Sequence, residues 1–275
     1  MKGLAKTSIV GLIKVILLAF IVEGCSKNDL SPSACQLGSY QIGAKGTSNY
    51  SYNNYFYNSG QLTGGQDLNG VYTFSYDEHN RITQIDYNEG KMCSIQYDGN
   101  GRISYEIWIY KPPSANNIIW IGPPAAPIIY RFSYNSSGQL ITQKAVKLNT
   151  PGDSSVLQIM TFQYPNANTH NYSSSSWLTY GSDTVTTNLT YEYDDKINPF
   201  LQNGYNLTSG VGATDNNVTQ VAMTAFSKQK ILYSDYTYNF TYTYTNAGYP
   251  LTQIFTSNAV PSESSVSTFS YTNCH

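Results

Sequence analysis

A short motif recurs along this chain and constrains its fold more than any other feature. Each copy reads aromatic residue, any residue, Tyr, Asp or Asn, a short turn, Arg or Gln, then Ile or Leu; the clear copies span 74–82, 95–103 and 132–140. Residues two apart in a strand share a face, so the aromatic pair in each copy points to one side. Tandem copies of such a motif predict consecutive β-hairpins, which build an antiparallel sheet.

The turn within each copy predicts a left-handed backbone at one position. A three-residue hairpin loop with a G1 bulge needs a positive φ at its last residue. Glycine adopts that conformation at least cost, and asparagine is the next-best residue. We therefore expect the turns to be defined by the residues at this position, which are Asn80, Gly101, Gly138 and Gly248, with Gly60 in a looser copy.

Looser copies of the motif extend the series over most of the chain. They span 56–62, 191–200, 242–251 and 269–271, at unequal spacing. Unequal spacing predicts a hairpin array with insertions instead of a strict solenoid. We expect one all-β domain over residues 35–275, in which tandem antiparallel β-hairpins form one curved, open or half-closed sheet.

Composition agrees with a β fold and excludes one class of partner. The chain has 26 tyrosines but only 12% charged residues, and no stretch sustains a helical apolar period. Tyrosine is enriched in strands, so this composition favours β-structure with polar turns. The net charge is −2 and no basic patch occurs, so we expect no nucleic-acid partner.

The first 24 residues read as an export signal. Lys2 and Lys6 precede the apolar run Val15–Val22, which is shorter than the roughly 20 residues of a membrane-spanning helix. The run ends at Cys25 in a segment that resembles the lipobox of bacterial lipoproteins, where the cysteine thiol is acylated. Two or more acyl chains hold a protein stably on a membrane. The alternative is an ordinary secretory signal with an incidental cysteine.

The expected organisation follows from that lipobox. Residues 1–24 form a lipoprotein signal peptide, 25–34 a lipidated polar tether, and 35–275 the β domain. We expect an outer-membrane lipoprotein that contacts the membrane through Cys25. The sequence does not decide whether it lies on the periplasmic or the cell-surface side of that membrane. An exported chain can oxidise thiols, so Cys35, Cys93 and Cys274 predict one disulfide and one free cysteine, without deciding the pair.

The motif resembles the YD repeats of Rhs-type proteins. More closely, the chain is similar to the small YD-repeat lipoproteins of Bacteroidota, a family without an established activity. The shared marks are the lipobox, the hairpin motifs, the segment Tyr191–Phe200, the turn Gly248–Pro250 and the ending Phe269–Cys274. Rhs proteins fold such repeats into an enclosing β-shell, and we expect this shorter chain to form an open or half-closed version.

Catalytic signatures are missing from the sequence. No GxSxG or HExxH motif occurs, and the three histidines are isolated from one another. No two cysteines or histidines have metal-ligand spacing. We therefore predict no enzymatic activity, no catalytic residue, no metal and no cofactor. The Asp77–Arg81 and Asp98–Arg102 pairs are interpreted as turn-capping ion pairs and not as a ligand site.

The segment 107–134 interrupts the regular spacing of the repeat. It is rich in isoleucine and proline and holds two tryptophans. It either extends the core through long strands or forms a lip that binds a ligand or partner. For the second interpretation, the candidate ligand-binding residues are Trp108, Tyr110, Trp120 and Tyr130.

Three functions remain open. The leading hypothesis is a non-catalytic binding or scaffold module of the cell envelope, with a glycan or an envelope protein as ligand. One alternative is a carrier that holds an apolar ligand on a concave sheet face, and another is a hydrolase acting on polysaccharides. A dry face of Ile, Leu and Phe would favour the carrier, clustered Asp and Glu the enzyme, and a flat Tyr and Trp platform the binding module.

Overall fold

The computed structural model describes residues 35–43, 50–88, 90–110, 126–150, 153–181, 183–202, 214–229, 231–259 and 264–272. The predicted signal and tether, with Cys25, lie outside these residues, as do Trp120 and Cys274. Tyr110 is described through its backbone only.

Within the described ranges the chain forms sixteen strands and one short helix. They are β1 (Gln36–Ile42), β2 (Ser51–Asn58), β3 (Gln61–Asp67), β4 (Gly70–Tyr76), β5 (Ile82–Tyr87), β6 (Lys91–Tyr97), β7 (Ile103–Tyr110), β8 (Ile128–Tyr134), β9 (Leu140–Thr150), β10 (Asp153–Gln163), β11 (Ser174–Thr179), β12 (Val185–Ile197), α2 (Pro199–Gln202), β13 (Asn216–Ser227), β14 (Leu232–Tyr244), β15 (Pro250–Ser257) and β16 (Ser265–Thr272).

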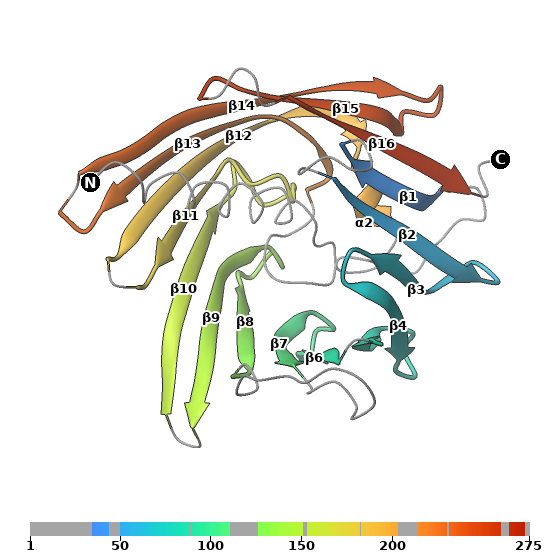
Figure 1. Cartoon of the computed structure of the whole chain (residues 1–275), viewed down its shortest axis with the longest axis horizontal. Helices are drawn as coiled ribbons and strands as arrows, with labels where there is room; N and C mark the ends of the chain where they lie inside the picture. Colours follow the sequence, from blue (N-terminus) through green and yellow to red (C-terminus); the bar gives the residue numbers. More distant parts are fainter. Residues whose placement is uncertain are drawn as a thin grey trace.

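The strands close into a barrel. Each strand pairs antiparallel with its neighbours in sequence, and β16 pairs with β1, so that Phe269 lies opposite Tyr40. Figure 1 shows the sheet curling from blue β1 round to red β16 beside it. The expected open or half-closed sheet is therefore wrong. Many strands have only seven or eight residues, so the chain provides enough strands to close, and closure pairs the two edges that an open sheet would expose.

The repeated motif forms the hairpin turns at one end of the barrel. Tyr76 lies opposite Ile82, and the backbone N–H of Asp77 donates to the carbonyl of Arg81 at 2.9 Å. The Asp98 and Asn135 turns have the same bond. The backbone is left-handed at the last loop residue of each turn: φ is 61° at Asn80, 79° at Gly101, 84° at Gly138, 84° at Gly248 and 86° at Gly60.

A tyrosine hydroxyl bonds each odd-numbered strand to the strand after it. It donates to a backbone carbonyl near the start of the preceding odd-numbered strand, as Tyr97 does to Ile82 at 2.8 Å. The donor is the motif tyrosine except in β14, where it is Tyr242, at the aromatic position two residues before Tyr244. The pairs are Tyr57 with Leu37, Tyr76 with Leu62, Tyr97 with Ile82, Tyr134 with Ile103, Tyr164 with Leu140, Tyr193 with Tyr172, Tyr242 with Val218 and Tyr271 with Pro250.

The arginines of the motif connect neighbouring copies. Arg81 pairs with Asp77 at 2.6 Å and lies over the ring of Tyr97, 4.3 Å from its centroid. Arg102 repeats this arrangement with Asp98 at 2.7 Å and with the ring of Tyr134 at 4.7 Å. The Asp, Arg and Tyr of the motif therefore hold turns and hairpins together.

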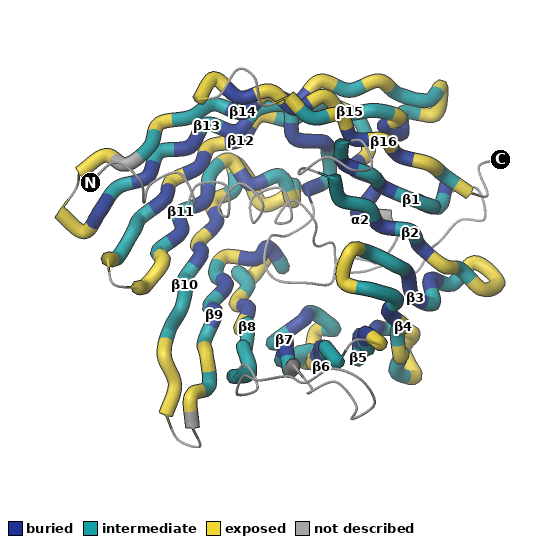
Figure 2. Tube along the Cα trace, viewed as in Figure 1, coloured by how far each residue is buried: buried dark blue, intermediate teal, exposed yellow. Residues whose placement is uncertain are grey.

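Side chains alternate along each strand between an inward face, which is mainly apolar, and an outward face. Along β12, Thr187, Leu189 and Tyr191 are buried in the barrel, while Asn188 and Thr190 between them are exposed. Figure 2 shows the same alternation of buried and exposed residues along other strands. The barrel therefore has its hydrophobic core on the inside.

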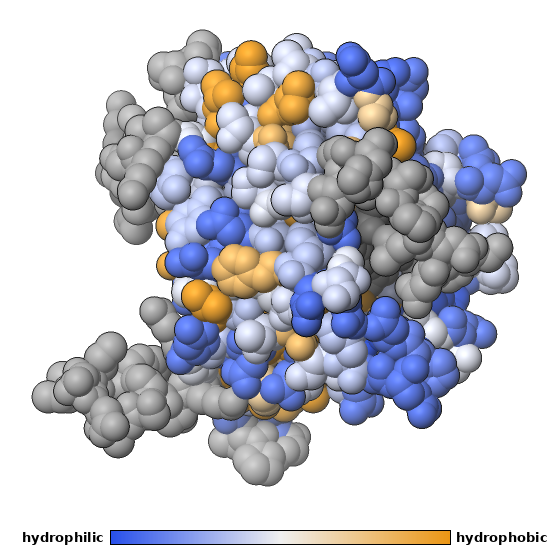
Figure 3. Space-filling view, turned by 90° about the vertical axis from the view of Figure 1, so that its right-hand side faces the viewer, coloured by the Kyte–Doolittle hydropathy of each residue, from blue (hydrophilic) through white to orange (hydrophobic). Residues whose placement is uncertain are grey.

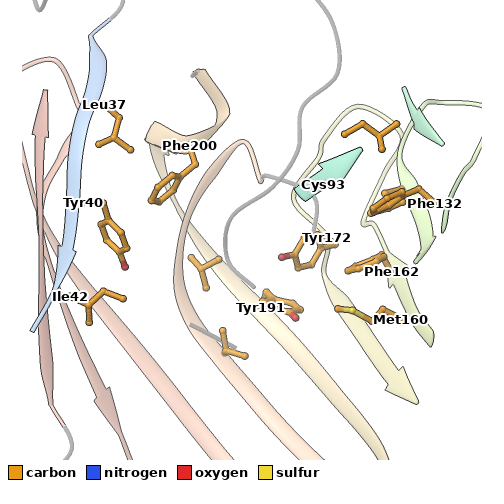
Figure 4. Packing of buried hydrophobic residues seen from close by; sticks show 14 of the residues in the cluster. Leu37, Tyr40, Ile42, Cys93, Phe132, Met160, Phe162, Tyr172, Tyr191 and Phe200 are labelled. Carbon is orange, nitrogen blue, oxygen red and sulfur yellow. The ribbon is translucent and has the colours of Figure 1, made fainter. Parts of the chain in front are cut away.

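The helix α2 places one aromatic side chain in this core. Asn198 caps the helix by accepting the N–H of Phe200 at 3.0 Å, and Pro199 occupies the first helical position, where its missing N–H costs nothing. The Phe200 ring meets Tyr40 edge-on, with centroids 5.4 Å apart. Figure 4 shows Phe200 reaching toward the β1 wall, where the buried side chains of Leu37, Tyr40 and Ile42 point to the interior.

Candidate functional site: the inner wall of the barrel

The inner wall is apolar over much of the described barrel. Its buried members come from all around the barrel; they include Leu37, Ile42, Leu62, Ile82, Ile85, Ile95, Ile103, Phe132, Leu140, Met160, Phe162, Leu189, Val218, Val221, Met223, Phe240, Phe255 and Phe269. Figure 4 shows side chains from several strands projecting into this interior.

The inward side chains form one hydrophobic cluster with little exposed surface. Tyr72, Cys93 and Val221 have none, and Leu37 and Leu189 are each 1% exposed.

The predicted ligand-binding residues lie on this inner wall. Trp108 is 6% exposed and Tyr130 is partly buried against the core. The Trp108 indole N–H donates to Glu106 Oε2 at 3.2 Å, and Glu106 is itself fully buried. The structure thus brings Trp108 and Tyr130 together on the inside of neighbouring strands, and its description does not extend to Trp120 or the Tyr110 side chain.

Lys91 is a cation on the same inner wall. It shares the face of Cys93, two residues further along β6, and starts that strand at the end of the barrel opposite the repeat turns. Its Nζ lies 4.2 Å from the Trp108 ring centroid and 5.0 Å from that of Tyr87. Burial lowers the Lys91 pKa, although the charge of Asp67 acts in the opposite direction. The sequence carried this signal, because Lys91 has the same strand parity as Ile95 and Tyr97.

Of the two cysteines that the structure describes, one is bonded and one is free. Cys35 is disulfide-bonded, and its partner is not among the described residues. Cys93 is a free thiol with no exposed surface. Burial, followed by the charge of Glu106, raises the Cys93 thiol pKa well above its ordinary value. A buried protonated thiol is a weak nucleophile.

Two polar clusters tie the barrel together at the repeat-turn end. His170 Nδ1 lies 3.1 Å from Asp215 Oδ1, and the His170 backbone N–H donates to the same carboxylate. The hydrogen bond to Asp215 raises the His170 pKa above its ordinary value. Asp194 accepts hydrogen bonds from Tyr244 and Asn217. These carboxylates are engaged in joining segments distant in sequence.

The described part of the chain contains no group of three or more His, Cys, Asp or Glu side chains placed to hold a metal ion. Within that same part, no helix has the length and apolarity required to cross a membrane.

The outer wall is apolar over some strands and polar over others. Its apolar positions lie side by side on β6 to β9 and include Met92, Ile107, Ile109, Ile129 and Val146. The outward positions of β14 are Thr237, Asn239, Thr241 and Thr243, of which the last three are exposed. Those of β16 are Thr268 and Ser270, beside the exposed Val266. Figure 3 shows one face of the molecule as mostly pale and blue, with scattered apolar residues and no continuous apolar band.

Comparison with solved structures identifies the same kind of barrel elsewhere. A porin-like protein from Bacteroides uniformis superimposes with a TM-score of 0.54 at 15% identity, over 86% of this chain and 98% of that chain. A porin-like protein from Bacteroides vulgatus aligns with a TM-score of 0.49 at 10% identity, over 87% and 99% of the two chains. No protein-family model matches the sequence, and no curated protein does.

The likeness concerns the fold alone at these identities. The alternation of side chains then adds an independent observation. Strands of a transmembrane barrel carry an apolar band about 25 Å tall on the outside and polar residues on the inside. Strand β12 has the reverse arrangement, because Leu189 and Tyr191 face in while Asn188 and Thr190 face out. Strands β7 and β8 do not share it, because Ile107 and Ile129 face out.

Proposed function

We propose that this protein is a non-catalytic binding protein of the cell envelope that holds an apolar or amphipathic small molecule against the inner wall of its barrel. One observation carries the proposal: the inward side chains of the described strands are mainly apolar, and the outward side chains of strands such as β12 are polar. A dry concave face lined by Ile, Leu and Phe was the feature that would favour a carrier over the other functions. Burial of a hydrophobic ligand contributes about 25 cal/mol per Å² of apolar surface removed from water.

The same observation argues against a channel that crosses a bilayer through its strands. Outward Asn and Glu side chains, such as Asn188 and Glu192, would lose their hydration in lipid. Membrane association in this proposal comes instead from acyl chains on Cys25, in the segment that resembles a lipobox. This combination describes a lipoprotein tethered beside the membrane, at the outer membrane in our interpretation.

A glycan platform has less support. The tyrosine hydroxyls that would have presented polar edges to a sugar are engaged with backbone carbonyls, as in Tyr97 and Tyr134. A hydrolase has less support as well, because Asp77, Asp98 and Asp194 are occupied by partners within the turns and clusters.

The test uses a neutral apolar probe and a matched pair of variants on β13. Ala225 faces the inside and Ala222 faces the outside of the same strand. Residues 26–275 include every strand of the closed barrel, so this chain is titrated with N-phenyl-1-naphthylamine, whose fluorescence rises in apolar surroundings. We expect saturable binding that Ala225→Phe weakens and Ala222→Phe leaves unchanged.

Two results would refute the proposal. One is the absence of saturable probe binding in the wild-type chain, which would favour a protein or glycan ligand. The other is equal weakening by the two variants at unchanged thermal stability, because an outer-wall substitution does not reach the inside. The lipid anchor is tested separately: labelled palmitate should enter the wild type and not Cys25→Ala.

A further inference from the structure

The seam at which the barrel closes differs from its other strand pairs. Among the sixteen described strands, each pair but one joins strands that follow each other in sequence, and the exception joins β1 to β16. Nearly the whole domain separates these two strands, so their pairing closes a much longer loop than a hairpin does, at a greater cost in chain entropy. In the loop-entropy picture, this seam is where a covalent cross-link stabilises the fold most.

A bulge interrupts the seam at the end where β1 begins. The register shifts between Leu37 and Ser39, so that only the pairs Gln36–Thr272 and Leu37–Tyr271 lie beyond it. The bulged residue is left out of the ladder, which isolates those two pairs from the rest of the seam. Strand ends with so few pairs open readily unless something ties them down. A link directly beyond Gln36 would hold this end closed.

Cys35 occupies that position. It directly precedes Gln36, is 7% exposed and is disulfide-bonded. Of the other cysteines in the chain, Cys93 is a free thiol on β6. The candidates for the partner within the chain are therefore Cys25 and Cys274.

The strand register favours Cys274. β16 ends at Thr272, opposite Gln36, and Cys274 follows two residues later, a reach of at most about 7 Å. Disulfide-bonded residues have Cα atoms about 4.4–6.8 Å apart, so a chain that continues from Thr272 can place Cys274 within that range of Cys35. Cys25 precedes Cys35 by ten residues and lies outside the described strands, so the strand register does not position it.

We propose that Cys35 and Cys274 form a disulfide that fastens the seam of the barrel and leaves the Cys25 thiol for acylation. The inference goes beyond the proposed function and does not depend on a ligand inside the barrel. When the bond forms, each thiol loses a proton and the two sulfur atoms join. The two electrons pass to a disulfide oxidant of the cell envelope, which becomes a dithiol.

Peptide mapping tests the pairing directly, because tryptic cleavage after Lys and Arg places each cysteine in a different peptide. Cys35 lies in 28–45, Cys93 in 92–102 and Cys274 in 231–275. The full chain is expressed with its export signal, purified in detergent without reductant, alkylated in urea and digested. We expect mass spectrometry to find 28–45 linked to 231–275, and 92–102 as a single alkylated peptide.

Three results of this mapping would refute the proposal. They are a link from 28–45 to the peptide that contains Cys25, a peptide 28–45 that carries an alkylated cysteine and no link, and a protein that runs as a disulfide-bonded dimer without reductant.

A double variant tests the role of the bond in the fold. Cys35→Ala, Cys274→Ala and the double variant should lower the urea midpoint equally, because each removes the same bond. Reduction of the wild type should lower its midpoint to the same value, and this measurement needs no variant to fold. The matched control is Cys25→Ala, which removes a cysteine outside the bond and should leave the midpoint unchanged.

The opposite outcomes are equally specific. Additive losses in the double variant, or a Cys25→Ala midpoint as low as that of Cys35→Ala, would contradict the pairing. A wild-type midpoint that does not change on reduction would show that the bond does not hold the seam.

Discussion

Removing one motif hydroxyl tests whether the tyrosines hold the barrel together. In Tyr97→Phe the ring remains under Arg81, but the hydroxyl that donates to the Ile82 carbonyl at 2.8 Å is lost. The net contribution of such a bond is about 1 kcal/mol, within a range of roughly 0.5–1.5. We expect the free energy of unfolding to fall by about that amount.

The matched control is Tyr105→Phe. Tyr105 lies on the outer face of β7, opposite Gln96 and Arg131, and its hydroxyl makes no hydrogen bond within the described part of the chain. Its loss should change stability by less than ~0.5 kcal/mol, as ordinary surface substitutions do. Equilibrium urea denaturation followed by tyrosine and tryptophan fluorescence measures both variants against the wild type.

A double variant makes the test quantitative. Tyr134 donates to Ile103 at 3.0 Å, two strands away from Tyr97, a separation of about 10 Å across the sheet. Substitutions that far apart add to within about 0.5 kcal/mol. The double Tyr→Phe variant should therefore lose about 2 kcal/mol. If Tyr97→Phe were no more destabilising than Tyr105→Phe, the structural role assigned to these hydroxyls would be refuted.

Three further measurements follow from particular contacts. Gly138→Ala should lower the free energy of unfolding by about 1–2 kcal/mol through its φ of 84° alone, because a Cβ there meets no atom within 4 Å. The control Gly99→Ala, where a Cβ also meets open space, should be near neutral, and equal denaturation midpoints for the two variants would contradict this. The raised His170 pKa stabilises the fold fully below the ordinary value of about 6.5, and that stability is lost as pH rises through the raised value. This pH dependence should amount to less than about 1 kcal/mol because the His170–Asp215 pair is partly exposed, and the His170→Gln variant should lack it. If the urea midpoints of wild type and variant did not differ in their change between pH about 6 and about 9, the His170–Asp215 contact would not contribute to stability. Iodoacetamide should modify Cys93 only after unfolding, as read by peptide mass spectrometry, and rapid modification of the native protein would contradict its burial.

The sequence predicted local structure well because local structure is encoded locally. The left-handed loop residues and the Tyr76–Ile82 pairing follow from a few adjacent residues in each turn. The sequence did not predict one copy, which contains Tyr164. A proline follows this tyrosine and the Asp and Arg of the motif are missing, yet its hydroxyl donates to the Leu140 carbonyl at 3.0 Å. Only the aromatic-x-Tyr pattern of Phe162 and Tyr164 survives there, which is too short a signal to identify alone.

Closure could not be read from the motif. Whether the sheet stays open depends on the total number of strands and on pairing between β1 and β16, whose residues Tyr40 and Phe269 lie at opposite ends of the chain. The motif fixes the register of each hairpin and leaves this long-range pairing undetermined. The choice of Trp108 and Tyr130 as ligand-binding residues stays a prediction, which rests on their place in an unusual segment. The inward position of Lys91 follows only when strand parity is combined with a closed wall.

Strand parity also limits what the structural comparison can imply. A closed antiparallel sheet gives each strand one inner and one outer face, and the same backbone can serve as a pore or as a container. On β12 the sequence gives an apolar inner face and a polar outer face, because Leu189 faces in while Asn188 faces out. On β7 and β8 the outer face carries Ile107 and Ile129, so it is apolar there. The likeness to porin-like proteins is therefore one of backbone fold, and the side chains of each strand determine what its two faces contact.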